Sequence, residues 1–219
     1  ILTAYMYAKN LKELSYQDVL EAGGKGASLG EMLQNGFPIP EGFVVLATTF
    51  EKFLEQAGIE AEIDSVLSTV KIENMDTVEA ASEKIKHLIS NATIPKKIAN
   101  EINNKFAKLD AEFVAVRSSA TAEDSSDAAW AGQLDTFLNS TKKDLLLNVQ
   151  KCWASLFSPR AIFYRFEKKL DKEKVSVAVV VQKMLQSDSS GIAFSVHPVT
   201  EDRDQILIEV GLGLGEAIV

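Results

Sequence analysis

The sequence predicts an α+β fold in which a helical insertion separates two groups of strands. Residues 48–109 carry apolar side chains at helical spacing with charged residues between them, a pattern typical of amphipathic helices. Short apolar runs on either side, at residues 43–46 and 176–185, have the length and composition of strands. We therefore expect a strand framework that is interrupted by a block of helices.

The first helix of this framework is expected close to a glycine-rich segment. Residues 15–22 show a short helical pattern that leads into Gly23-Gly24-Lys25-Gly26. Ser28, followed three residues later by Glu31, fits a capping box. We therefore predict that the helix begins at Ser28 and ends before Pro38.

Beyond the insertion the chain returns to strands and helices. Alternating apolar residues up to Arg117 are typical of a buried strand, and a turn is expected in the small residues that follow it. Further strands are predicted at 135–138, 191–196 and 205–210, and helices at 145–157 and 161–170.

We expect two lobes from this order of elements. Residues 1–110 form a lobe with the lysine loop and the helical insertion, and residues 111–219 form a strand-rich lobe. The chain begins with Ile1 and stops at Val219, just after a glycine-rich turn. We therefore expect it to be a piece of a longer protein, truncated at its C-terminus.

Composition limits the classes of function. The 219 residues carry a formal net charge of −8, which argues against a sequence-independent nucleic-acid binder. The single cysteine, Cys152, gives neither a disulfide framework nor a cysteine metal cluster. No apolar run is long enough to span a bilayer, and the first residues do not form a signal segment. We expect a cytoplasmic protein without nucleic-acid or membrane partners.

The segment from Val114 to Asp124 carries the strongest functional signal. It brings Arg117 into a run of small hydroxyl residues, and Gly132 follows a few residues later. Arginine offers a planar fork of donors that suits phosphate oxygens, and serine and threonine hydroxyls add further donors. The alternative is a strand that ends in a serine-rich surface loop, with Arg117 paired to a nearby acid such as Glu123.

The loop around Lys25 is a second candidate for phosphate binding. It is not a Walker A motif, because Val19 stands where the first glycine is required and Gly26 where serine or threonine is required. Amides at the start of a helix beside a lysine nevertheless attract anions. A plain flexible turn remains the alternative.

Three other segments carry weaker signals. Residues 182–185, Gln-Lys-Met-Leu, end the most apolar strand and could receive an adenine ring, although an ordinary edge strand explains them as well. The glycines from Gly211 to Gly215 lack the spacing of a dinucleotide-binding motif, since Glu216 occupies its last required position. His197 lacks ligand partners at useful spacing, so we expect it to cap a turn. No metal site is assigned within the chain.

Together these segments resemble the phosphoenolpyruvate synthases and related dikinases. The matching segments occur in the family's order, at residues 23–32 with 38–43, 116–124 with 131–133 and 136–139, 190–195, and 213–217. The related pyruvate phosphate dikinases have Ser-Gly-Ala after this arginine, so Ser118-Ser119-Ala120 favours the synthase branch. Trp130 departs from the family pattern, in which phenylalanine is usual.

The resemblance implies an ATP-grasp-like nucleotide-binding domain that uses ATP and Mg²⁺. The residues carried over by motif are Lys25 and Arg117 as phosphate-binding and catalytic residues, Gly132 in the loop that covers the phosphates, Thr136 facing the nucleotide, and Gln182 and Met184 at the adenine. In such synthases ATP phosphorylates a histidine on a swivelling domain, which carries the group to a pyruvate-binding domain. The resemblance places those domains and the Mg²⁺ ligands beyond residue 219, so we expect this chain alone to catalyse no full reaction.

Two alternatives remain open. Rifampicin phosphotransferases share the Arg-Ser-Ser block and differ mainly in their downstream domains. A stand-alone nucleotide-binding module without chemistry is the alternative from another functional class.

Overall fold

The computed structural model describes residues 5–121, 135–167 and 176–215. Its contacts divide the chain into two compact units, residues 1–184 and 185–219. The lobe boundary that we predict at residue 110 falls inside the first unit and stays a prediction. Gly132, Glu123 and Trp130 lie outside the described residues.

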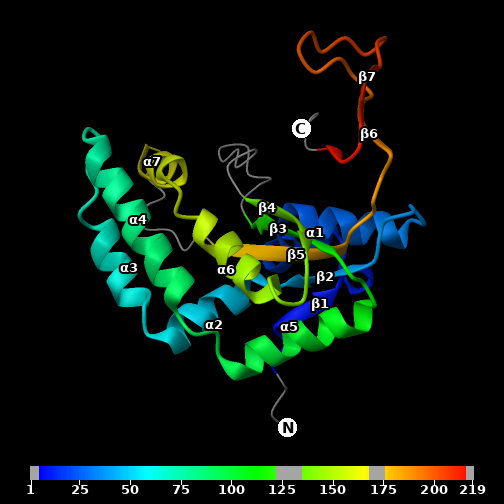
Figure 1. The fold of residues 1–219 in the computed structure, drawn as a ribbon. Coiled ribbons are helices and arrows are strands. Elements are labelled where there is room, and N and C mark those ends of the chain that lie inside the picture. Colours follow the sequence, from blue (N-terminus) through cyan, green and yellow to red (C-terminus); the bar gives the residue numbers. More distant parts are fainter. Residues whose placement is uncertain (1–4, 122–134, 168–175, 216–219) are drawn as a thin grey trace. The chain divides into compact units, whose positions relative to one another are not determined.

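A five-stranded antiparallel sheet forms the centre of the first unit (Figure 1). Its strands, in spatial order, are β1 (Ala8–Asn10), β2 (Gly42–Val45), β5 (Val177–Lys183), β3 (Val114–Ala120) and β4 (Thr136–Ser140). The central strand β5 is buried along almost its whole length, which explains why its sequence is continuously apolar rather than alternating.

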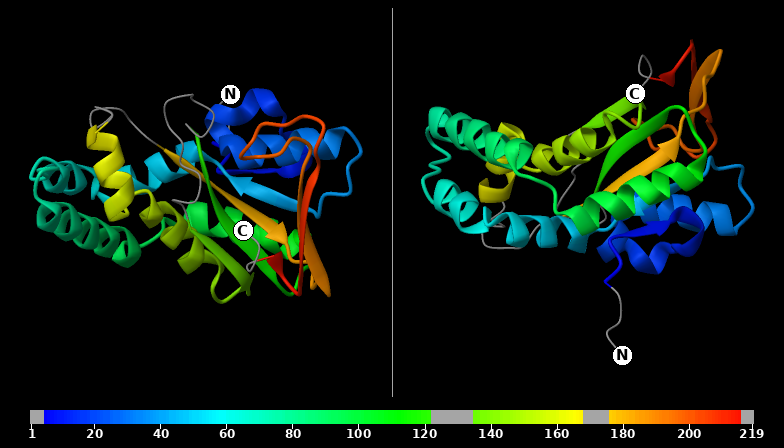
Figure 2. Two further views of the ribbon diagram at one scale, coloured as in Figure 1. Left: turned by 90° about the horizontal axis from the view of Figure 1, so that it is seen from above. Right: turned by 60° about the horizontal axis from the view of Figure 1, so that its bottom comes forward.

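Helices cover both faces of this sheet (Figure 2). Alternate residues of β2 and β5, such as Val44 and Val180, form a small apolar cluster with Ala22 of α1 (Val19–Gln34). The residues between them, such as Val45 and Val181, belong to the larger core, which contains Trp153 of α6 (Leu145–Ser155). Because side chains alternate across a strand, α1 and α6 define opposite faces of the sheet.

The helical insertion is confirmed. Between β2 and β3 the chain forms α2 (Ala47–Ala57), α3 (Glu60–Leu67), α4 (Met75–Asn91) and α5 (Lys96–Leu109). The helix α7 (Pro159–Glu167) packs against α4, in the group of helices beside the sheet (Figure 1). None of the described helices has the length and apolarity needed to cross a bilayer.

The second unit contains one antiparallel hairpin, formed by β6 (Ser189–Phe194) and β7 (Leu207–Leu212). Both strands occur where the apolar runs predict them. Between them, the ring nitrogen Nδ1 of His197 accepts hydrogen bonds from the amides of Val199 and Thr200, at 3.3 and 3.2 Å. The predicted turn-capping role of His197 is therefore confirmed.

The predicted capping box at Ser28 is wrong. Ser28 lies in the interior of α1, which begins at Val19 and kinks at Gly23. Glu31 instead accepts hydrogen bonds from the amide of Tyr16 and from the side chain of Asn35. The local pattern gave the wrong helix start because the helix segment after the kink is capped by a residue of β3, which is distant in the sequence.

Candidate functional site

The site begins at a tight contact between α1 and β3. Gly23 has φ of 69° and ψ of 167°, so the helix breaks there and restarts. A Cβ atom on Gly23 would lie 2.2 Å from Oγ and 2.3 Å from the carbonyl oxygen of Ser119. Only glycine allows both this conformation and this approach.

The same serine caps the restarted helix. The amide of Gly26 donates a buried hydrogen bond to Oγ of Ser119, with a distance of 3.2 Å. Amides in the first turn of a helix lack partners within the helix, and a serine oxygen is a preferred substitute. Lys25, which is half-buried, lies directly before Gly26, so this hydrogen bond fixes the position of the Lys25 backbone. The glycine-rich segment around Lys25, expected to be a loop, is part of α1.

Arg117 lies on the same face of β3 as Ser119, because the two residues are two positions apart in a strand. The hydroxyl of Ser118, between them, lies 3.4 Å from Oγ of Ser155 on α6, which places Ser118 on the opposite face. The face of β3 that carries Arg117 is therefore the face on which α1 packs. The structure brings the segments of Lys25 and Arg117 together through Ser119.

Thr136 is the direct neighbour of Arg117 across the sheet. The register pairs Arg117 with Thr136 on β4 and with Val180 on β5. Directly opposed residues in antiparallel strands have their side chains on the same face. Thr136 is exposed and Arg117 is half-buried, so a hydroxyl and a guanidinium group share a partly open surface.

The serines after Arg117 do not have the expected role as phosphate donors. The strand continues through them to Ala120, so both are buried. Ser118 donates to the carbonyl oxygen of Asp135 at 2.7 Å, while Ser119 caps the helix. These hydroxyls hold the fold together around Arg117, and the predicted serine-rich loop is absent at these two positions.

The predicted adenine-binding segment lies at the end of β5. Gln182 is buried, and its Nε2 donates to the carbonyl oxygen of Pro40 at 3.0 Å. The amide of Met184 donates to the carbonyl oxygen of Phe113 at 3.0 Å, and the amide of Lys183 donates to that of Glu41 at 2.8 Å. The segment is thus held on both sides, and Met184 is the last residue of the first unit.

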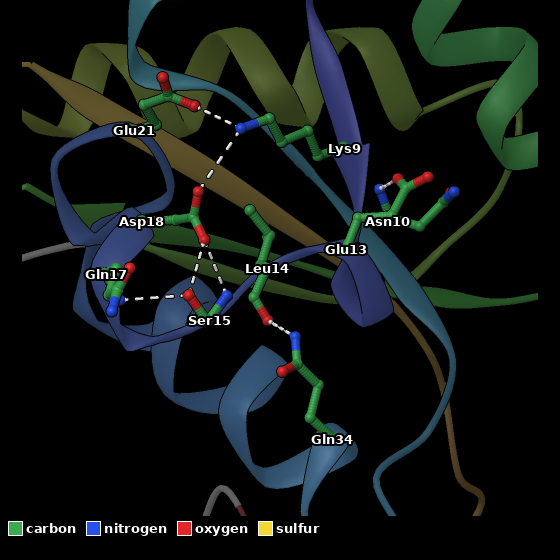
Figure 3. A network of polar contacts seen from close by, with 9 residues as sticks. All are labelled: Lys9, Asn10, Glu13, Leu14, Ser15, Gln17, Asp18, Glu21 and Gln34. Carbon is green, nitrogen blue, oxygen red and sulfur yellow. Dashed lines mark hydrogen bonds and ion pairs between the residues drawn. The ribbon is translucent and has the colours of Figure 1, made fainter.

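A polar network holds the part of α1 that precedes the kink (Figure 3). Lys9 Nζ on β1 lies 2.6 Å from Glu21 Oε2 and 3.5 Å from Asp18 Oδ1. The hydrogen bond to Glu21 raises the pKa of Lys9. The amide of Ser15 donates to Asp18 at 2.8 Å and, as the largest cause, lowers the pKa of that carboxyl group.

The sequence that forms this site matches a known protein family. A family profile described as "Pyruvate phosphate dikinase, AMP/ATP-binding domain" matches residues 19–219. The chain belongs to this family. The match begins at the first residue of α1 and includes Lys25, Arg117, Thr136 and the segment from Gln182 to Met184.

Similar proteins of known name agree with this membership. A "Probable phosphoenolpyruvate synthase" of Methanothermobacter thermautotrophicus is 44% identical over 97% of this chain. A "Phosphoenolpyruvate synthase" of Pyrococcus furiosus is 36% identical over 99%. A "Rifampicin phosphotransferase" of Bacillus subtilis is 39% identical over 95%. The chain spans only 32% and 31% of the two synthases and 24% of the phosphotransferase.

Two residues that position α1, Lys9 and Gly23, could not be recognised from the sequence. Lys9 reaches α1 from a three-residue strand, which is too short to show an alternating pattern. The role of Gly23 depends on Ser119, far along the chain. The Gly-Gly pair before Lys25 was the only local signal, because glycine pairs often mark positions with unusual backbone angles.

Two further observations concern chemistry elsewhere in this domain. In the described part of the chain, no three side chains of the types His, Cys, Asp and Glu lie together in a way that would hold a metal ion. Cys152 on α6 is buried, and this burial raises the pKa of its thiol to about 12. The thiolate is the reactive form of cysteine, so the folded protein keeps this side chain inert.

Proposed function

We propose that this chain is the ATP-binding part of a phosphoenolpyruvate synthase with an ATP-grasp-like arrangement. The full protein would transfer a phosphoryl group from ATP to a histidine on a swivelling domain and then to pyruvate, giving phosphoenolpyruvate, AMP and phosphate. The observation that carries the proposal is the contact of Ser119 with Gly23 and Gly26. It holds the part of α1 that carries Lys25 against the strand face that presents Arg117 and Thr136.

The proposed chemistry of this face is charge neutralisation and positioning. Phosphoryl transfer needs mainly these two contributions from a protein. Lys25 supplies a point charge, and Arg117 supplies a planar fork that can hold two phosphate oxygens at once. Thr136 adds a hydroxyl donor beside Arg117, and Gly132 is proposed to lie in the covering loop. In a chain of net charge −8, such local cations are what makes a phosphate site possible.

The end of β5 is proposed to receive the adenine. Because the amides of Lys183 and Met184 already donate within the fold, recognition there depends on backbone carbonyl oxygens and on the side chains of Gln182 and Met184. An apolar side chain such as Met184 can cover the face of a purine, while polar groups orient its edge.

Mg²⁺ would neutralise phosphate charge and orient the transferred group. The described residues offer no cluster of metal ligands, so no step is assigned to the metal within this chain. We propose that its ligands, like the phosphorylated histidine and the pyruvate site, belong to the remainder of the full-length protein.

A second candidate function is rifampicin phosphorylation. The observation that favours it is the 39% identity to the Bacillus subtilis enzyme, which lies within the 36–44% range of the two synthases described above. The acceptor decides between the two. AMP formation by the full-length protein that depends on pyruvate supports the synthase, whereas AMP formation that depends on rifampicin supports the alternative.

The test of the nucleotide site uses ATP titration of the full-length protein and of Arg117→Ala. The control is Arg160→Ala, which removes an exposed arginine from α7. We expect at least a tenfold loss of ATP affinity for Arg117→Ala and none for the control. Equal affinity of Arg117→Ala and the wild type would remove Arg117 from the site.

A further inference from the structure

Ser119 makes two contacts with the start of the helix segment that follows the kink in α1. Its side-chain oxygen accepts the hydrogen bond from the amide of Gly26, and its backbone and Oγ face Gly23 so closely that no Cβ fits between them. Both glycines are buried, and Ser119 itself has no exposed surface. The helix start is therefore clamped on the two residues that flank Gly24 and Lys25.

The clamp is made entirely by the protein's own residues. Ser119 reaches the start of the restarted helix from β3, which is paired with β5 from Val114 to Ala120 and with β4 on its other side. A strand that is paired on both sides opens less readily than a kinked helix start rich in glycine. Contacts of this kind reduce the ordering that nucleotide binding would otherwise require.

We propose that Ser119 is a positioning residue for phosphate binding: it sets the backbone from which Lys25 extends, without touching the nucleotide itself. This inference rests on the proposed function of Lys25 and deepens it. Arg117, two residues earlier on the same strand face, then keeps a fixed relationship to Lys25. The strand β3 would thus carry Arg117 itself and, through Ser119, also hold the start of the helix segment that carries Lys25.

A positioning role for Ser119 predicts that the effects of Ser119 and Lys25 on ATP affinity are coupled. If Ser119 acts only through Lys25, its removal should weaken binding of a nucleotide with phosphates and leave binding of adenosine unchanged. Its effect should also disappear once Lys25 is removed, because residues that act through one another are not additive. A serine that matters only for folding would show neither property.

The experiment is a double-mutant cycle on the full-length protein with Ser119→Ala, Lys25→Met and their combination. ATP and adenosine are titrated against each variant. Ser82→Ala is the control, because Ser82 is also buried and its hydroxyl also bonds to a distant backbone group: it donates to the carbonyl oxygen of Phe157 at 2.7 Å, away from the candidate site. Ser119→Gly, which also removes the hydroxyl and adds no volume beside Gly23, is measured alongside in case Ser119→Ala does not fold.

We expect a five- to tenfold loss of ATP affinity for Ser119→Ala, unchanged adenosine affinity, and no further loss when Ser119→Ala is added to Lys25→Met. Equal losses for ATP and adenosine, the same loss in Ser82→Ala, or full additivity with Lys25→Met would each overturn the positioning role. A loss in Lys25→Met without one in Ser119→Ala rejects this inference and keeps the proposed function. No loss in Lys25→Met rejects both.

Discussion

Arg117 on β3 lies directly opposite Thr136 on β4, and both side chains are on the sheet face against which α1 packs. A half-buried cation and an exposed hydroxyl from neighbouring strands therefore share one partly open surface. The pairing follows from antiparallel register, in which opposed residues have adjacent side chains. The pairing joins residues from two separate sequence motifs, and it places Thr136 beside Arg117 in the proposed site.

This pairing predicts the effect of Thr136→Val. Valine keeps the shape of threonine and suits a strand, so the stability should change little at this exposed position. Loss of one hydroxyl donor should lower ATP affinity by about 1 kcal/mol, or roughly fivefold, and leave adenosine affinity unchanged. Isothermal titration of both ligands measures this. Unchanged ATP affinity would show that Thr136 does not face the phosphates.

The clamp at Gly23 predicts a large cost for Gly23→Ala. The methyl group would add the strain of a positive φ and would also collide with Ser119. A backbone with φ of 69° and ψ of 167° is essentially restricted to glycine and costs about 1–3 kcal/mol in another residue, and overpacking adds about 1–3 kcal/mol. Equilibrium denaturation measures the sum as a lower free energy of unfolding.

Gly58→Ala is the control for a positive φ at an open position. Gly58 has φ of 68° and ψ of 24°, in the left-handed region that L residues can adopt, and a Cβ there meets nothing within 4 Å. We expect this variant to lose only about 1 kcal/mol. If Gly23→Ala is no more destabilised than Gly58→Ala, neither the backbone conformation of Gly23 nor its close contact with Ser119 carries energetic weight.

The network around Lys9 predicts a dependence of stability on acid pH. The pKa of Asp18 is lowered in the fold, mainly by the amide of Ser15. A carboxyl group of this kind stabilises the fold above its unfolded pKa of about 3.9 and loses that contribution as pH falls through its folded value. Because the side chain of Asp18 is only partly buried and solvent screens its charge, we expect about 0.5–1 kcal/mol at neutral pH.

Asp18→Asn tests this expectation. The free energy of unfolding of the variant should lie below that of the wild type at pH 7, and the two should converge below pH 4. Asp64→Asn, at an exposed position on α3, is the control. A gap between Asp18→Asn and the wild type that is the same at pH 7 and pH 3 would contradict a role for the ionised carboxylate.

The burial of Cys152 predicts that the folded chain is inert to thiol reagents. With its pKa raised to about 12, almost no thiolate exists at pH 8, and the side chain is covered by protein. A disulfide reagent such as DTNB should modify this cysteine only as fast as the protein opens, and at once in denaturant. Immediate reaction of the folded chain would contradict the described packing of α6.

Local patterns were sufficient for most elements and insufficient for the contacts between them. The insertion at residues 48–109 could be predicted because amphipathic periodicity is a local signal. The helix start at Ser28 was wrong because the cap of Gly26 comes from Ser119, 93 residues away. The same distance explains why Ser118 and Ser119 were expected to bind phosphate, since no local feature showed that the strand would continue through them.

The most direct test of the central proposal is a crystal structure of the full-length protein with a non-hydrolysable ATP analogue. We predict phosphate oxygens within hydrogen-bonding distance of both Lys25 Nζ and the guanidinium group of Arg117, with the adenine at Gln182 and Met184. Phosphates bound elsewhere, with Lys25 and Arg117 both out of reach, would contradict it.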